Sequence, residues 1–254
     1  SIDSLRLEEA QPAPYLLFTI TDESGNTVRR LKAPAKKGLQ RITWDFRYDA
    51  PDPVSFNEPD PMNFFSGPDL GAMAFAGNYK VALSKFEDGT FTELVPAQPF
   101  KVVSLNAVSL SAADKKALEN FTQKAASLVR ALGGAQGVYG ELNSKMRFLK
   151  AAWQSTPKAP AGLQTQFLTI EKQLTALSTA LYGDRTLARR EFETLPSISE
   201  RVGRIQGNLV STSAVPTQTM LTSYQTVAKQ FTAFLTDLRK TQTDIIALET
   251  ALQS

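Results

Sequence analysis

The sequence predicts a segregated α+β protein, with an N-terminal β-sandwich at residues 1–104 and an elongated, all-α antiparallel helical bundle at 105–254. Ten of the 14 prolines lie before residue 105. Before that point, short β-branched and aromatic runs alternate with turn signals, as is typical of small sandwiches. After it, apolar residues recur at alternating spacings of three and four, which is helical periodicity.

The first region contains six predicted strands, at 14–21, 26–33, 41–46, 77–86, 91–95 and 99–105. DESGN at 22–26 and EDGT at 87–90 predict hairpin turns between neighbouring strands. Because side chains alternate along a strand, Ile42, Trp44 and Phe46 are expected to share one face. We expect them to form a core with Tyr79 and Val81, with Trp44 buried against Tyr79, Val81 or Phe18. Asp45 and Arg47 are expected to face outward.

The segment 49–76 is a long loop rich in proline, carboxylates and aromatic residues. Long loops without secondary structure are often functional, so it is the candidate ligand or partner site. Its candidate residues are Asp49, Asp52, Phe56, Asp60, Phe64, Phe65 and Asp69. The carboxylates suit calcium or sugar hydroxyls and the aromatics suit stacking, although the EF-hand pattern is absent. The alternative is a cover that only packs on the rest of the protein.

The second region contains four predicted helices, at about 112–155, 160–182, 197–211 and 217–253. Ser111 with Asp114, Ser197 after Pro196, and Thr217 after Pro216 are expected at helix N-termini. Four glycines at 133–140 weaken the first helix, but its apolar stripe continues through them.

The stripe in the last helix consists of Leu221, Tyr224, Ala228, Phe231, Leu235, Leu238, Gln242, Ile245, Glu249 and Leu252, with polar breaks at Gln242 and Glu249. The two middle helices carry shorter stripes: Leu163, Phe167, Ile170, Leu174, Leu177 and Leu181 in one, and Ile198, Val202, Ile205 and Leu209 in the other. Two arrangements remain open for the middle helices: residues 183–196 either continue one rod or reverse it into a compact four-helix bundle. The charged residues at 184–193 either form ion pairs that fix this joint or are solvated.

The amino-acid composition excludes several kinds of catalytic and metal site. The chain has no Cys and no His, which excludes thiolate zinc sites and Ser-His-Asp catalysis. Carboxylate-pair chemistry, Lys or Tyr chemistry and calcium held by oxygen ligands remain open. Asp45 with Asp49 or Asp52 is the candidate carboxylate pair, but a small sandwich rarely offers a deep cleft. We therefore assign no catalytic residue, no metal site and no cofactor.

The distribution of charge and hydropathy indicates whether the chain binds nucleic acid or crosses a membrane. The net charge is +3, with −3 in residues 1–104 and +6 in 105–254. The basic residues are scattered, so no nucleic-acid partner is expected. No apolar run of membrane-spanning length occurs. A start without Met suggests the interior of a longer polypeptide.

The motif order resembles a known extracellular module. A D-x-x-G-x-x-V-R hairpin, a G-x5-W-D strand and a G-x-Y strand resemble the immunoglobulin-like modules of bacterial flagellar hook-capping and secretion-sorting proteins. The matching residues are Asp22, Gly25, Val28 and Arg29, then Gly38, Trp44 and Asp45, then Gly77 and Tyr79. The long loop at 49–76 departs from that pattern.

With LYGDRTLARREFETLPSISERV and STSAVPTQTMLTSYQTVAKQF, the whole chain resembles the C-terminal region of secreted bacterial sortilin-like, neuraminidase-repeat β-propeller proteins, often described as glycosyl hydrolase-like. The resemblance implies an immunoglobulin-like sandwich that packs on an upstream propeller of the same polypeptide, in the extracellular space, periplasm or cell envelope.

The expected function is a non-catalytic accessory or interaction region, monomeric or weakly dimeric, with envelope proteins or glycans as further partners. Two alternatives remain: a carbohydrate-binding or glycoside-hydrolase-associated module that uses loop 49–76, and a coiled-coil oligomer.

Overall fold

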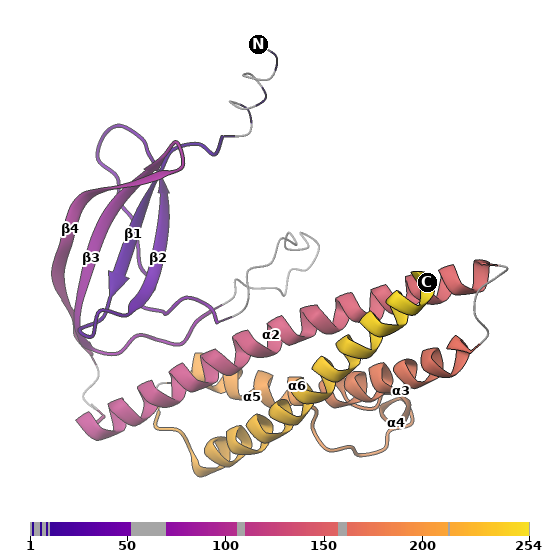
Figure 1. Ribbon diagram of the computed structural model, residues 1–254. Coiled ribbons are helices and arrows are strands. Elements are labelled where there is room, and N and C mark those ends of the chain that lie inside the picture. Colours follow the sequence, from indigo (N-terminus) through magenta and orange to yellow (C-terminus); the bar gives the residue numbers. More distant parts are fainter. Residues whose placement is uncertain are drawn as a thin grey trace. The chain divides into compact units, whose positions relative to one another are not determined.

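The computed structural model describes residues 11–51, 70–105, 110–156, 162–212 and 214–253, together with positions 2, 6 and 9. Strands come first and helices follow, which confirms the segregated α+β class (Figure 1). The chain divides into two compact units, one with the strands and one with the helices from Lys116 onward, and each is described by itself. The elements are β1 (Tyr15–Thr21), β2 (Thr27–Pro34), β3 (Gly77–Glu87), β4 (Thr90–Val102), α2 (Ala112–Ser155), α3 (Leu163–Tyr182), α4 (Arg185–Ala188), α5 (Ile198–Ser211) and α6 (Gln218–Gln253).

The strands form one antiparallel sheet in the order β2-β1-β3-β4. Both predicted hairpin turns are present. Asp22 accepts from the Gly25 and Asn26 amides, and Gly25 has φ +83°. Asp88 and Gly89 both have positive φ, at 50° and 75°, which suits a tight two-residue hairpin.

The last two predicted strands are a single strand, β4. It spans both Pro96 and Pro99 and has irregular register where it pairs with β3 from Val81 to Ser84. A proline removes a ladder donor, but an edge strand tolerates this where its N–H would face solvent. The position of β4 at the sheet edge therefore explains why the prolines do not divide it.

The predicted strand at 41–46 is wrong. Residues 41–45 carry no strand structure, and Phe46 adopts a left-handed φ of +57°. In the part of the chain that the structure describes, the four strands make one open sheet, and the second sheet of the predicted sandwich is not seen. The alternation at 41–46 arises because the segment lies over a core, which selects apolar residues as a strand partner would.

One face of the sheet is covered by irregular backbone. Ile20, Val28 and Tyr79 are buried there. The side chains packed around them come from the sheet and from two loop segments: Leu31, Trp44, Tyr48, Ala74, Val81, Phe100 and Val102. These loop segments pair with each other over a short stretch, through an Arg47–Met73 bridge and the bonds Tyr48 N–H to Ala72 O and Ala74 N–H to Phe46 O.

The helices follow the predicted stripes. All six stripe residues of α3 and all four of α5 are buried. The long first helix runs unbroken through its glycines from residue 112 to 155, as predicted. Ser111 accepts from the Asp114 amide, Thr217 accepts from the Met220 amide, and Ser197 with Glu200 forms a complete capping box.

In α6 the buried seam differs by one residue from the prediction at four positions, where Val227, Phe234, Thr241 and Leu248 are buried in place of Ala228, Leu235, Gln242 and Glu249. The buried residues are Val227, Phe231, Phe234, Leu238, Thr241, Ile245 and Leu248. Gln242 is exposed and Glu249 lies at the seam's border, so neither interrupts it. The single polar seam residue is Thr241, whose hydroxyl donates to the Asp237 carbonyl one turn earlier.

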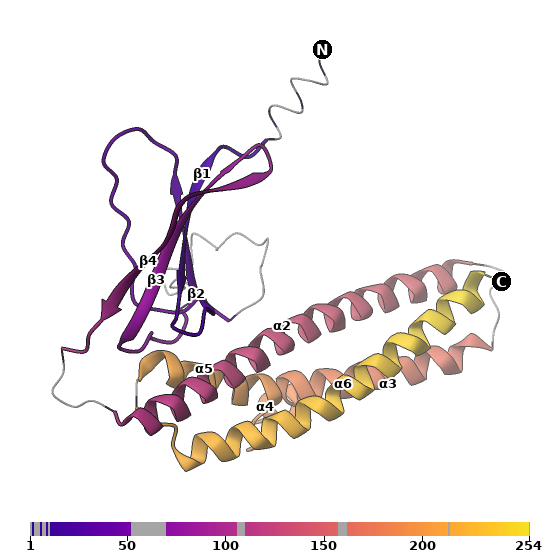
Figure 2. The same cartoon turned by 60° about the vertical axis from the view of Figure 1, so that its left-hand side comes forward.

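The middle helices continue one rod, which is the first of the two arrangements left open. Tyr182 at the end of α3 contacts Tyr139 of α2. Ser199 at the start of α5 accepts a hydrogen bond from Gln136, which lies one turn before Tyr139 on α2. The rod runs antiparallel to α2 and α6, beside which it lies (Figure 2). No helix in the described ranges has the length and apolarity required to cross a membrane.

Candidate functional site

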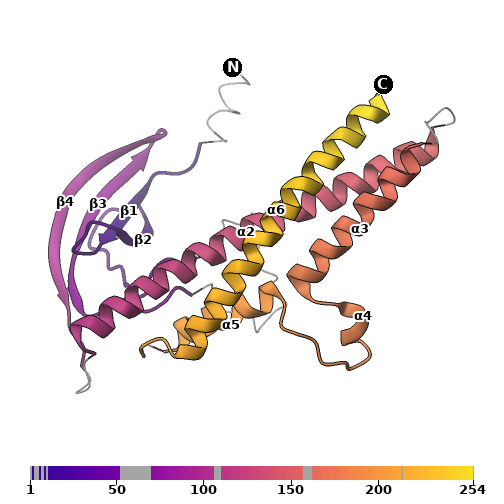
Figure 3. The same ribbon diagram turned by 60° about the horizontal axis from the view of Figure 1, so that its bottom comes forward.

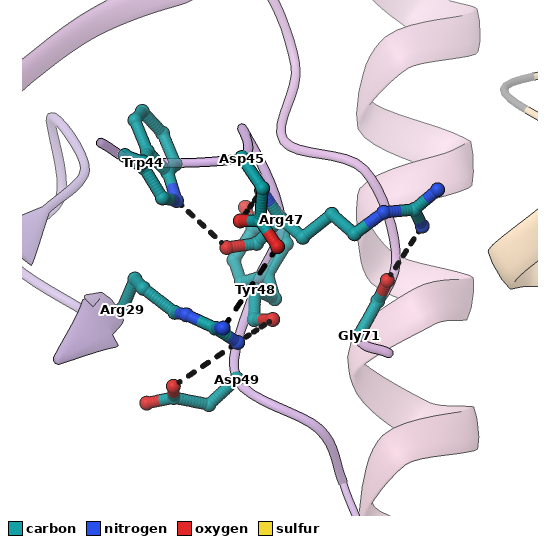
Figure 4. A network of polar contacts seen from close by, with 7 residues as sticks. All are labelled: Arg29, Trp44, Asp45, Arg47, Tyr48, Asp49 and Gly71. Atoms are coloured by element: carbon teal, nitrogen blue, oxygen red, sulfur yellow. Dashed lines mark hydrogen bonds and ion pairs between the residues drawn. The ribbon is translucent and has the colours of Figure 1, made fainter. Parts of the chain in front are cut away.

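A polar network lies where the predicted functional loop leaves and rejoins the sheet unit. We call it the loop clamp and define it by the seven residues of Figure 4: Arg29, Trp44, Asp45, Arg47, Tyr48, Asp49 and Gly71. Arg29 comes from β2 and the others from the two covering segments. The clamp therefore joins both feet of the loop to the sheet.

Arg29 is the centre of the clamp. Its side chain is 23% exposed; Nη1 donates to the Tyr48 carbonyl at 3.1 Å and lies 3.5 Å from the Asp49 carboxylate, and Nη2 lies 3.8 Å from Asp45. A hydrogen bond from a charged donor is among the stronger contributions a surface network can make. The side chain of Asp45 is 44% exposed and that of Asp49 is 52% exposed, so their ion pairs with Arg29 are weakened by solvent.

The remaining bonds fix the backbone at residues 44–47. The Trp44 indole N–H donates to the Arg47 carbonyl at 2.9 Å, and Asp45 accepts from the Arg47 amide at 3.1 Å. These bonds close the tight bend that places Phe46 at positive φ. Arg47 then reaches across to the Gly71 carbonyl at 2.9 Å, so it does not simply face outward.

Gly71 is required by close backbone approach. A Cβ added there would clash with the Tyr48 carbonyl and lie 2.7 Å from the Asp49 carbonyl. No side chain fits at that distance, so glycine lets the two feet of the loop meet.

The predicted core residues differ in how deeply the structure buries them. Tyr79 is buried and Val81 packs beside it, while Trp44 and Ile42 are half-buried. Trp44 contacts Tyr79 edge-on at 5.5 Å, one of the three contacts expected for it. Phe46 is 49% exposed, so its expected place in the core is wrong, because the bend turns it away.

Among the predicted loop-site residues, Asp49 alone falls in a described range, and it pairs with Arg29. Asp52, Phe56, Asp60, Phe64, Phe65 and Asp69 lie outside the described residues. The candidate carboxylate pair Asp45 and Asp49 flanks one guanidinium, an arrangement that holds a backbone in place. In the ranges described, no three carboxylates gather closely enough to share a metal ion.

A second candidate site lies in the helical unit, and the sequence did not indicate it. Between α3 and α5 the chain leaves the rod at Gly183 and returns at Ser197, and a Cβ on Gly183 would lie 3.9 Å from that of Ser197. We call residues 183–197 the joint loop; Figure 3 shows it, with α4, beside the rod. Between this loop, the end of α3 and residues 230–241 of α6 is a cavity of about 870 Å³, which we call the joint groove.

The joint loop contains none of the ion pairs considered for it. In the described residues, the charged side chains at 184–193 form no salt bridge; instead Asp184 accepts from the amides of Thr186 and Leu187 and caps α4. Large apolar residues of this loop face solvent: Leu195 is 84% exposed and Phe192 61%. Local capping and backbone hydrogen bonds therefore hold the joint, and its apolar rim is available for contact.

The face of the sheet opposite the buried core of Ile20, Val28 and Tyr79 carries a small aromatic cluster. Tyr15 stacks on Phe86 at 4.8 Å, Phe86 contacts Phe91 at 4.9 Å, and Lys32 Nζ lies 3.8 Å from the centre of the Tyr15 ring. Cross-strand register pairs Tyr15 with Phe86 and Phe86 with Phe91, so the cluster closes one end of the sheet.

Comparisons with protein-family models, with curated proteins and with solved structures found no match for this chain.

Proposed function

We propose that this chain is a non-catalytic accessory region of a larger secreted or envelope β-propeller protein, and that its helical unit binds a partner. The joint groove carries the proposal. An interrupted rod with a large groove and solvent-facing leucine and phenylalanine side chains is unusual for a surface with no partner, because exposed apolar patches commonly mark interaction sites.

The loop clamp supports the non-catalytic part. Asp45 and Asp49 are partly exposed, but each pairs with Arg29 and helps to hold the feet of a loop. The clamp thus has a structural role that explains its residues without a reaction.

The propeller context rests on the resemblance in motif order. The immunoglobulin-like form of the first unit belongs to this proposal too: the paired segments at 46–49 and 72–74 would correspond to a reduced second layer. An extracellular, periplasmic or envelope location follows from the same resemblance. The carbohydrate-binding alternative depends on residues 52–69, which lie outside the described ranges.

The gene that encodes Ser1 gives the first test. We expect its reading frame to continue upstream into repeated propeller blades; a frame without them would overturn the accessory role.

A deletion in the natural gene product gives the second test. Removing residues 112–253 is expected to abolish assembly or partner binding while any catalytic activity of the whole protein persists. Unchanged assembly, measured by light scattering and co-purification, would contradict a role for the helical unit.

A further inference from the structure

The joint groove has an apolar floor built by three elements. Leu177 of α3, Ile198 of α5 and Phe234 of α6 line it, and each is only 3% exposed. Alanines and a proline extend the lining, and Leu187 and Leu195 of the joint loop form a rim that is 40% and 84% exposed. A ligand with apolar side chains would bury this rim, which the chain itself leaves in water.

Of the four charged residues that line the groove, three are acidic and one is basic, whereas Arg185, Arg189 and Arg190 of the joint loop are not part of its lining. Asp184, Glu193 and Asp237 line it, opposed by Lys240 alone. Over the residues that the structure describes, Glu193 and Asp237 form no ion pair with a side chain of this protein. This acidic groove lies in a half of the chain whose net charge is +6, so its sign opposes that of its surroundings.

Gln173 also lines the groove. Its Nε2 donates to Asp244 at 2.9 Å, and its Oε1 is buried with no donor from the described residues. Because that oxygen is itself buried, a ligand in the groove would meet the exposed carboxylates of Glu193 and Asp237 instead. These acidic residues select a ligand that carries positive charge and donates hydrogen bonds.

We propose that the joint groove binds a basic, apolar peptide segment of a partner protein, in which lysine or arginine residues flank large apolar side chains. The apolar side chains would lie against Leu187 and Leu195 of the rim, and the cationic ones beside Glu193 and Asp237. This inference names the partner chemistry for the interaction role proposed above and rests on it.

Fluorescence anisotropy with short labelled peptides and the full 254-residue chain tests the proposal. Three peptides have the same arrangement of charged and apolar positions. The first has lysine and leucine at these positions, the second has glutamate in place of lysine, and the third has serine in place of leucine. We expect the lysine–leucine peptide to bind at least about tenfold more tightly than either of the others, and its binding to weaken with salt.

Charge variants locate the site. The double variant Glu193→Lys, Asp237→Lys should bind the lysine–leucine peptide about tenfold or more weakly than the unchanged chain. The variant Lys240→Glu should bind this peptide more tightly. All three residues are exposed, so folding should persist, and circular dichroism checks this. Glu141→Lys, an exposed acidic position on α2 outside the groove, is the matched control and should leave affinity unchanged.

The outcomes separate this inference from the broader function. Equal binding of all peptides, absence of binding, or binding that the groove variants do not change would overturn the basic-segment proposal. If the deletion of 112–253 still abolishes assembly in that case, the accessory function stands and only the partner chemistry is wrong.

Discussion

Single residues in the sheet unit show how a polar side chain can set the path of a loop. Arg29 faces the covering segments from β2, and its guanidinium contacts one backbone carbonyl and two carboxylates. Trp44 adds an apolar contact with Tyr79 and a hydrogen bond to Arg47. The sequence marked Trp44, Asp45 and Arg29 as part of one motif, but it could not show that they act together, since their contacts depend on the bend at Phe46.

Replacing Arg29 tests the clamp. Arg29→Ala should destabilise the sheet unit by about 1–3 kcal/mol, because the Tyr48 carbonyl loses a charged donor. Amide hydrogen exchange should speed up most at Tyr48 and Ala74, whose N–H groups bond across the covering segments, and at Asp49, whose N–H donates to the Val28 carbonyl of β2. Arg30→Ala, at the exposed neighbouring position, is the control. Equal exchange in the two variants would show that the clamp does not hold the loop.

We expect the unfolding free energy of the helical unit to depend on pH through the carboxyl group of Glu200. Hydrogen bonds from the Ser197 amide, and then from its hydroxyl, lower the pKa of Glu200. A lowered folded-state pKa means that its stabilisation is present above the unfolded value, about 4.3, and is lost as pH falls through the folded value. Glu200→Gln should therefore flatten the decline in unfolding free energy in this acidic range, measured by urea titration. An unchanged slope would contradict the capping role of the carboxylate.

At the scale of elements, α6 shows why a stripe in the sequence can be misplaced. The predicted and observed seams share Phe231, Leu238 and Ile245 but differ by one residue elsewhere, because neighbouring residues such as Phe234 and Leu235 are both apolar. Periodicity gives the approximate face of a helix; the neighbours α3 and α5 decide which residues on that face are fully covered.

Two adjacent isoleucines test this seam. Ile245 is fully buried and Ile246 is 51% exposed. Ile245→Ala should cost about 2–4 kcal/mol of unfolding free energy, whereas Ile246→Ala should cost less than about 1 kcal/mol. Equal losses in chemical denaturation would place the seam elsewhere on the helix.

The exposed glycines of α2 provide a second test at this scale. Gly134, Gly137 and Gly140 are helical and exposed, and a Cβ at each would meet no atom within 4 Å. Each change to Ala should stabilise the helix by about 0.5–1 kcal/mol, seen as a higher melting temperature by circular dichroism. Gly71→Ala, where backbone blocks the Cβ, should destabilise instead. A stabilised Gly71 variant or destabilised helix variants would contradict these assignments.

At the scale of the whole molecule, the helical stripes are covered within one chain. The seams of α3, α5 and α6 face one another and α2, so the helices that the structure describes keep no continuous apolar stripe for an intermolecular coiled coil. We expect light scattering to give a mass near the 27.8 kDa of one chain at low concentration. A stable dimer mass independent of concentration would support the coiled-coil hypothesis instead.

The sequence by itself determined the α+β division, both hairpin turns, the helix starts, and the buried faces of α3 and α5. These features depend on local chemistry and on periodicity, which are complete in the sequence. Only the tertiary structure decided that 41–46 covers a sheet rather than joining one, that α3 and α5 form one rod, and that the joint loop opens a groove. Each of these depends on which distant segment supplies a hydrogen-bond partner or a covering side chain, and spacing along one segment carries no such information.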